Sequence, residues 1–214
     1  MTPDPIIKIC GITRAADALH AVEEGATALG FVFWPRSPRV ISRERARDII
    51  ATLPAHVTMV GVFVNESADG IRRVVEATGI HAVQLHGDEK PQDADGIDLP
   101  ILKSVSLDDA AEQSSVWPED TTLLLDVADP VRRGGTGVVI DWARAAEVAR
   151  HHRVVLAGGL TPLNVEQAIR TVSPVGVDVS SGVEESPGVK NAERVSSFLS
   201  SARRAFAALQ KRTL

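Results

Sequence analysis

The chain has 214 residues, 44% of them hydrophobic and 24% charged, which is the balance of a soluble globular protein able to bury a core without disulfides. A formal net charge of −5 argues against nucleic acid as the main partner, and no apolar run approaches the ~18 residues of a membrane span. The one cysteine, Cys10, excludes an intramolecular disulfide, and the N-terminal residues lack the pattern of a signal peptide, so we expect a cytoplasmic protein.

Short apolar segments alternate with helical patterns from one end of the chain to the other. The predicted strands are rich in Val, Ile and Leu, as in a parallel sheet buried on both faces. They are Ile6–Cys10, Ala28–Phe33, Thr58–Val64, Ala82–His86, Ile101–Ser104, Leu123–Asp126, Val154–Ala157 and Val175–Val179. The predicted helices are Thr13–Glu24, Ser42–Leu53, Ala68–Thr78, Leu107–Ser114, Asp141–Arg150, Thr161–Val172 and Ala192–Leu209.

Helix signals vary along the chain. Hydroxyl side chains suited to N-caps precede four helices, at Thr13, Ser42, Ser67 and Thr161. The connection between the fourth and fifth strands is the exception, because Pro91 and Gly96 interrupt it and leave room for a turn or two of helix at most. We therefore expect a short, irregular fourth crossover.

Eight strand units in sequence predict an α/β fold with a parallel sheet. An open, doubly wound sheet would usually carry a glycine-rich turn after its first strand, and no G-x-G-x-x-G occurs in the sequence. Nothing in the composition divides the chain. The pattern favours a single domain over residues 1–214, a (β/α)₈ TIM barrel near the lower size limit of that fold.

Polar residues interrupt several of the predicted strands. In a barrel strand alternate residues face the interior, so Lys8 and Cys10 share one face, as do Gln84 and His86. Asp126 and Asp178 lie close to the carboxyl ends of their strands, where the active sites of barrels form. The plainer interpretations are that Lys8 and Asp178 form a structural ion pair, that His86 is a rim histidine and that Cys10 is a small apolar residue.

Two glycine-containing segments indicate an anion site. Gly158 and Gly159 follow the seventh strand, and Ser180-Ser181-Gly182 follows the eighth. Backbone amides in these two loops are the usual phosphate position of TIM barrels. Gly134 and Gly135, beyond Asp126, suggest a mobile loop that folds over a ligand, with a simple surface turn as the alternative.

Motifs for other chemistries are missing from the sequence. The six histidines form no H-E-x-x-H motif, one cysteine cannot build a zinc cluster, and there is neither a G-x-S-x-G elbow nor a P-loop. We therefore expect no metal and no cofactor.

Taken together, the motifs resemble those of the phosphoribosylanthranilate isomerase family, in order and along nearly the whole chain. They are Lys8–Thr13, Gly30–Phe33 with Ser37–Arg39, Val60–Val64, Val83–Gly87, Leu124–Asp126, Gly134–Gly137, Ala157–Leu160 and Gly176–Glu184, followed by Pro187, Gly188 and Lys190.

The resemblance implies an Amadori rearrangement of a phosphosugar, the expected small-molecule partner. It makes Asp126 the general acid that opens the ribose ring and Cys10 the general base at C2′. It also makes Arg39 the residue that would hold the anthranilate carboxylate and places Asp178 near the ribose, and we further expect His86 to bind the substrate. The phosphate would bind at Gly158, Gly159, Ser180, Ser181 and Gly182. Lys8 and a helix start after Cys10 would lower the pKa of the thiol.

Two alternatives stay open on the sequence alone. One is the sister isomerase of histidine biosynthesis, or a bifunctional isomerase, although those resemble longer barrels with an aspartate at the position of Cys10. The other is a non-catalytic phosphometabolite-binding barrel, which would have lost Cys10 or Asp126. No exposed helix pattern marks a dimer patch, so we expect a monomer.

Overall fold

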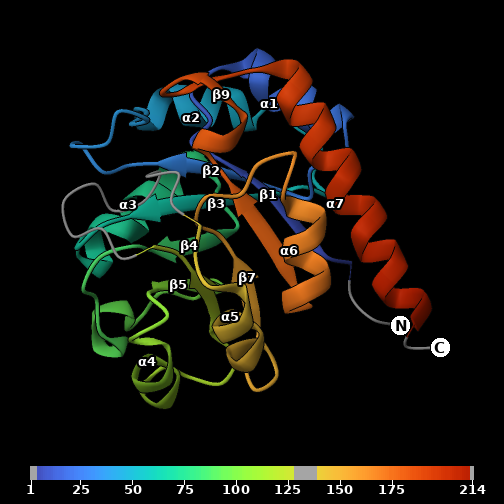
Figure 1. Cartoon of the computed structure of the whole chain (residues 1–214). Coiled ribbons are helices and arrows are strands. Elements are labelled where there is room, and N and C mark those ends of the chain that lie inside the picture. Colours follow the sequence, from blue (N-terminus) through green and yellow to red (C-terminus); the bar gives the residue numbers. More distant parts are fainter. Residues whose placement is uncertain (1–3, 128–138, 213–214) are drawn as a thin grey trace.

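Eight parallel strands form a closed barrel in the computed structural model, which describes residues 4–127 and 139–212. The first strand pairs with both the second and the last, Ile9 with Leu29 on one side and with Val179 on the other. This closure excludes the open, doubly wound sheet and confirms the barrel (Figure 1). The strands are β1 (Ile6–Cys10), β2 (Ala28–Val32), β3 (Thr58–Phe63), β4 (Ala82–Leu85), β5 (Ile101–Val105), β6 (Thr122–Leu125), β7 (Val154–Leu156) and β8 (Gly176–Val179).

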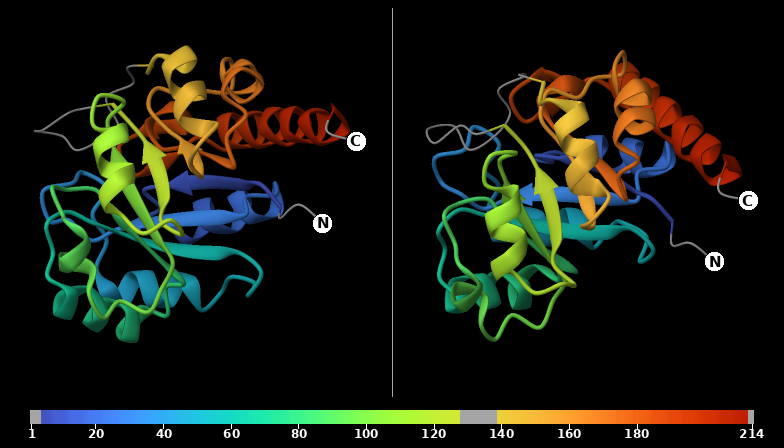
Figure 2. Two further views of the ribbon diagram at one scale, coloured as in Figure 1. Left: turned by 90° about the horizontal axis from the view of Figure 1, so that it is seen from below. Right: turned by 60° about the horizontal axis from the view of Figure 1, so that its bottom comes forward.

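Helices cover the outside of the barrel, and α7 is the longest of those described (Figure 2). None of the helices in the described ranges is long and apolar enough to cross a membrane. The helices are α1 (Ala15–Glu23), α2 (Arg43–Ile50), α3 (Ala68–Thr78), α4 (Ala110–Val116), α5 (Trp142–Ala149), α6 (Val165–Val172) and α7 (Ala192–Arg212).

Two of the four predicted N-caps are confirmed. The hydroxyls of Ser42 and Ser67 accept backbone N–H groups at the starts of α2 and α3. The other two are wrong. The Thr13 hydroxyl donates instead to the carbonyl of Gly188, and α1 begins two residues later than Thr13. The Thr161 hydroxyl does accept the backbone N–H of Leu163 at 3.3 Å, but α6 begins only at Val165, so Asn164 and not Thr161 occupies the N-cap position.

The fourth crossover is short, as predicted, with a single 3₁₀ turn, η1 (Pro91–Ala94). Lys103 points away from the barrel interior into the space that this crossover leaves, and its ammonium lies 2.8 Å from Glu89. The Glu89 carboxylate also accepts the backbone N–H groups of Asn65 and Gly87. A fully hydrogen-bonded buried ion pair therefore joins β5 to the loops after β3 and β4 in place of a packed helix.

The barrel interior follows the alternation predicted for its strands. Small and branched apolar residues form one buried cluster inside the barrel, namely Ala28, Val60, Ala82, Leu102, Leu124, Val155 and Ala157. Nearer the carboxyl ends the interior becomes polar, because Lys8 and Asp178 are paired by strand register and both are buried. Cys10 is next on the same face and packs against Val32 and Val62.

A β-hairpin that the sequence did not predict follows β8. After a 3₁₀ turn, η2 (Ser181–Val183), the short strands β9 (Glu184–Ser186) and β10 (Val189–Lys190) pair antiparallel. The Lys190 amide donates to Asp17 on α1, so the hairpin is fixed to the start of the chain. It lies over the β1 side of the barrel near α1 and α2 (Figure 1).

Candidate active site

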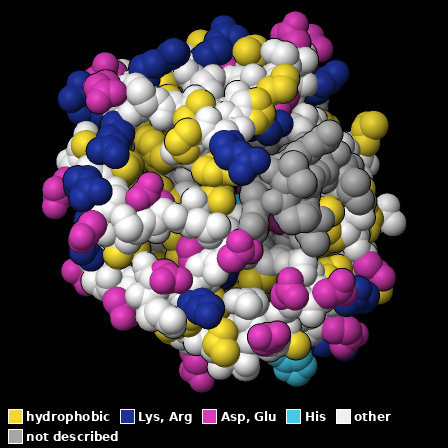
Figure 3. Space-filling model, turned by 90° about the vertical axis from the view of Figure 1, so that its left-hand side faces the viewer, with side chains coloured by type: hydrophobic (Ala, Val, Ile, Leu, Met, Phe, Trp, Pro, Cys, Tyr) yellow, Lys and Arg dark blue, Asp and Glu magenta, His cyan; other side chains and the backbone are white. Residues whose placement is uncertain are grey.

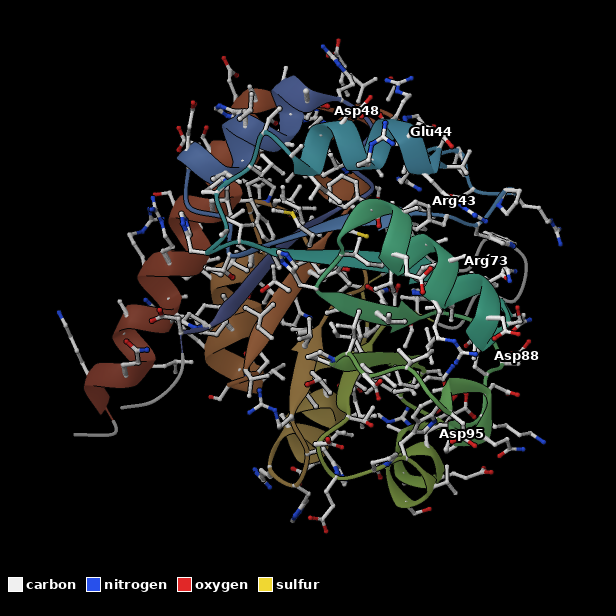
Figure 4. The ribbon with its side chains drawn as sticks, turned by 180° about the vertical axis from the view of Figure 1, so that it is seen from behind. Arg43, Glu44, Asp48, Arg73, Asp88 and Asp95 are labelled. Carbon is white, nitrogen blue, oxygen red and sulfur yellow. The ribbon has the colours of Figure 1, made fainter. Side chains whose placement is uncertain are left out.

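The polar side chains predicted for the site lie at the carboxyl ends of the strands. Figure 3 looks at this side of the molecule, where Lys, Arg, Asp and Glu side chains are interspersed around the rim. Figure 4 shows Arg43 and Glu44, at the start of α2, on the same side as Asp88, which follows β4. The helices therefore begin at the edge where the strands end, as the βα repeat requires.

Cys10 shares the base of this site with a buried ion pair. Lys8 is fully buried, and its Nζ lies 2.9 Å from Oδ1 of Asp178. Gly30 on the neighbouring strand makes room for both residues, because a methyl group there would stand 2.8 Å from Cys10 Sγ and 3.0 Å from Lys8 Nζ. The predicted ion pair is therefore present, and the ammonium that forms it also lies beside the thiol.

The expected lowering of the pKa of Cys10 is wrong. Burial raises the pKa of the thiol above its ordinary value, although Lys8 acts to lower it. The helix dipole gives little help, because α1 begins only at Ala15. Burial alone would lower the pKa of Lys8, but Asp178 and Cys10 raise it, so this ammonium stays charged.

Arg39 belongs to a second buried charge network. Its Nε and Nη2 donate to the two carboxylate oxygens of Glu184 at 2.8 and 2.7 Å. Lys190 Nζ donates to the same carboxylate at 2.9 Å, and to the carbonyl oxygen of Ser180 at 3.3 Å. Burial would raise the pKa of Glu184, but Arg39 and Lys190 lower it, so the carboxylate is ionised.

Asp126 and His86 come together on the opposite part of the mouth. Asp126 Oδ1 accepts the backbone N–H of Val127 at 2.7 Å, and Oδ2 lies 3.7 Å from His86 Nε2. The other ring nitrogen of His86 lies 2.9 Å from the amide nitrogen of Gln84. A cavity of about 660 Å³ opens here between the ends of β4, β5 and β6, and His86 and Asp126 line it, whereas Cys10 and Arg39 do not.

The glycine loops join these two groups of residues. Gly158 and Gly159 have φ values of 75° and 65°, a region that favours glycine, and Gly158 packs against the carboxylate of Asp126. A Cβ at Gly182 would collide with the carbonyl oxygen of Leu160, so the loops after β7 and β8 touch. Their amides are thus held between Asp126 on one side and the Cys10 strand on the other.

The hydroxyl of Ser180 lies close to Gly11 and to the side chain of Arg39. It is buried, and it has no hydrogen-bond partner within residues 4–127 and 139–212. A methyl group at Gly11 would stand 3.1 Å from this hydroxyl oxygen and 2.6 Å from Cδ of Arg39, so the two side chains flank the same point. An unpaired buried hydroxyl costs free energy unless a ligand or water satisfies it.

The sequence did not indicate the roles of Glu184 and Lys190 in this site. Glu184 and Lys190 stood in the matched motifs without a role, yet they hold Arg39. A signal was available, because a buried arginine requires a carboxylate partner and Glu184 follows the last strand. Gly134 and Gly135 lie outside the described residues. Within those residues, no group of His, Cys, Asp and Glu is arranged to hold a metal ion.

The sequence matches a known protein family over most of its length. Residues 7–201 match the family model of N-(5'-phosphoribosyl)anthranilate (PRA) isomerase. The N-(5'-phosphoribosyl)anthranilate isomerase of Pelobacter propionicus is 46% identical over 197 residues, which cover 90% of this chain and 93% of the relative.

Two solved structures share the barrel. A phosphoribosyl anthranilate isomerase in complex with reduced 1-(o-carboxyphenylamino)-1-deoxyribulose 5-phosphate is 40% identical and superposes with a TM-score of 0.83. A monomer form of the dimeric enzyme from Thermotoga maritima is 39% identical, with a TM-score of 0.82. Each comparison covers 92% of this chain and 98% of the solved chain.

Proposed function

Because the chain belongs to the N-(5'-phosphoribosyl)anthranilate isomerase family, we propose that it converts N-(5'-phosphoribosyl)anthranilate to 1-(2-carboxyphenylamino)-1-deoxyribulose 5-phosphate in tryptophan biosynthesis. The observation that carries the assignment of residues is the arrangement of the mouth. A carboxyl group directly after β6 and a thiol on β1 lie on opposite sides of the glycine loops after β7 and β8.

In this proposal the rearrangement needs one acid and one base. Asp126 gives its proton to the ring oxygen of the ribose, the C1′–O bond breaks, and the anilino nitrogen forms an iminium. Cys10, as the thiolate, then removes the proton from C2′ to give an enol, which tautomerises to the ketone. Lys8 stabilises the thiolate, because its ammonium lies beside the sulfur in a buried site where charge interactions are strong.

The other predicted residues orient the substrate. The amides around Gly158, Gly159, Ser181 and Gly182 take the phosphate, and Ser180 supplies a free hydroxyl. Asp178 and His86 contact the ribose side, and Arg39 takes the anthranilate carboxylate. Contacts with both ends of the substrate fix C1′ and C2′ between the acid and the base, which is the condition for positional catalysis.

The function is tested by complementation of bacterial auxotrophs. We expect the gene to restore growth without tryptophan to a strain that lacks this isomerase, and not to restore growth to a histidine auxotroph that lacks the sister isomerase. Rescue of both strains would indicate the bifunctional enzyme. If neither strain is rescued while the purified protein still binds the reduced product, the barrel is a non-catalytic binding protein.

Replacement of Gly159 by aspartate tests the phosphate site. Aspartate and asparagine both tolerate the positive φ of this position, so the two variants differ mainly in charge. A carboxylate about 4 Å from the phosphate costs up to about 4 kcal/mol, so we expect KM to rise roughly 100-fold in Gly159→Asp and far less in Gly159→Asn. Equal KM values in the two variants would show that the phosphate does not bind at this loop.

The proposal also covers the domain organisation, the cellular location and the oligomeric state of the protein. We propose that residues 1–214 form one domain, which the pairing of β1 with β8 supports. A cytoplasmic location agrees with a single, buried thiol. A monomer is proposed because the sequence marks no dimer patch, and the dimeric relative makes sedimentation equilibrium the deciding measurement.

A further inference from the structure

The guanidinium of Arg39 is only partly used by Glu184. An arginine side chain carries five N–H donors, and Glu184 accepts one from Nε and one from Nη2, along one edge of the group. The second edge, formed by Nη1 and the remaining N–H of Nη2, is the one suited to a bidentate contact with another carboxylate. The Arg39 side chain keeps 13% of its surface exposed, whereas Glu184 keeps 5%.

Glu184 is itself firmly held. Besides Arg39, its carboxylate accepts Lys190 Nζ at 2.9 Å and the backbone N–H of Gly188 at 3.1 Å. Its main-chain carbonyl accepts Arg194 at 2.6 Å. A carboxylate bound by this many donors in a buried position does not rotate away easily, so it acts as a fixed support for the arginine.

The charges around Arg39 are not balanced. The described cluster at this end of β1 and β8 contains the cations Lys8, Arg39 and Lys190 and the carboxylates Asp178 and Glu184. Burial lowers the pKa of Lys190 although Glu184 opposes this, and with Lys190 charged and Cys10 protonated one positive charge is left without a partner inside the cluster. The buried Ser180 hydroxyl, which has no partner among the described residues, lies beside the same arginine. A substrate with two anionic groups would satisfy both, with its carboxylate at Arg39 and its phosphate at Ser180.

We propose that Glu184, held by Lys190, is a positioning residue that aims the outer edge of Arg39 at the aromatic carboxylate of the substrate and so determines specificity for it. The inference rests on the proposed function, since it needs Arg39 to bind that carboxylate. Lys190 extends the support to the phosphate loop, because it also donates to the Ser180 carbonyl. The hairpin of β9 and β10 thereby ties together the sites for the two anionic ends of the substrate.

If Glu184 competed with the substrate for Arg39, its replacement would have the opposite effect on substrate binding. If Glu184 merely occupied Arg39 until the substrate displaced it, loss of its charge would free the arginine and tighten binding. If it positions Arg39, loss of its charge weakens binding of the carboxylate and leaves the rest of the substrate unaffected. The sign of the change therefore separates a support from a competitor.

The experiment uses calorimetry with two probes, the reduced product analogue and the same molecule without its ring carboxyl group. We expect the wild-type protein to prefer the carboxylated probe by at least about tenfold, since charge-assisted bonds to arginine carry that preference. In Glu184→Gln this preference should fall to about threefold or less, while the affinity for the uncarboxylated probe stays within about twofold. Arg39→Lys and the Glu184→Gln/Arg39→Lys double variant should show the same reduced preference, because both changes act on one contact.

Controls separate this effect from a loss of stability. Glu89→Gln removes a carboxylate that is equally buried, paired with Lys103 and bound to backbone N–H groups, but that pairs with no arginine among residues 4–127 and 139–212. We expect it to lower the melting temperature and to leave the preference unchanged. Because Glu184→Gln leaves Lys190 without its carboxylate, Glu184→Gln/Lys190→Gln serves as a second variant with no uncompensated buried charge.

The outcomes are distinct. An undiminished preference in a folded Glu184→Gln protein, or tighter binding of the carboxylated probe, overturns the positioning role. A wild-type protein that binds both probes equally contradicts the assignment of Arg39 in the proposed function instead. Preference lost equally in Glu89→Gln would assign the effect to general destabilisation and overturn the inference.

Discussion

Replacing Asp126 by asparagine will lower kcat by about 10²–10⁴-fold and leave KM close to the wild-type value. The carboxylate accepts the Val127 amide through Oδ1 and packs against Gly158, and an asparagine of the same shape keeps both contacts. It cannot, however, give a proton to the ring oxygen. Substrate binding therefore survives while the ring-opening step is lost.

The measurement is the steady-state rate of the purified variant, followed by the loss of substrate fluorescence. Asp88→Asn is a suitable control, because Asp88 is an exposed carboxylate on the same side of the barrel, two residues after His86 (Figure 4). We expect the control to keep the wild-type kcat. A normal kcat in Asp126→Asn would show that another group protonates the ring.

Replacing Cys10 by serine is expected to have an effect of the same size, about 10²–10⁴-fold on kcat. Serine fits the space beside Gly30 and leaves the Lys8–Asp178 pair intact. Its hydroxyl does not ionise near neutral pH even beside an ammonium, so it cannot remove the C2′ proton. A serine variant with more than a tenth of the wild-type kcat would rule out the thiolate as the base.

The thiol itself can be titrated directly. The sequence has one cysteine and no tyrosine, so the thiolate absorbance near 240 nm reports Cys10 without overlap from tyrosinate. Because burial raises the pKa of Cys10, we expect a midpoint above the free-thiol value of about 8.5, and no transition in Cys10→Ser. By linkage, protonation of this thiol stabilises the fold fully below the ordinary thiol pKa, and this stabilisation is lost as the pH rises through the raised pKa.

The fold was readable from the sequence because its signals are local. The predicted strands are short apolar segments separated by helical patterns, and each of these patterns can be recognised within a few residues of sequence. The ends of helices were less predictable. Thr13 and Ser42 have the same side-chain chemistry, but Thr13 bonds to Gly188, which is 175 residues away in the chain, and no local pattern carries that information.

The sequence assigned roles only to residues that would contact the substrate themselves. Cys10, Arg39, Asp126, Glu184 and Lys190 all stand in motifs, but Glu184 and Lys190 act through a neighbour that folding brings to them, so their motifs gave them no role. The predicted direction of the pKa shift of Cys10 was wrong for the same reason. The adjacent lysine is visible in the sequence, but the burial that outweighs it arises from packing of several strands.

The pairing of Lys8 with Asp178 also bears on how the protein is made. The two residues are 170 positions apart, on the first and the last strand, so Lys8 leaves the ribosome long before its carboxylate partner exists. Until β8 is synthesised, a lysine destined for complete burial must remain in water, and the barrel cannot close around it. The surroundings of Cys10 are thus completed only after β8 has been synthesised, and no shorter nascent chain gives the thiol its native environment.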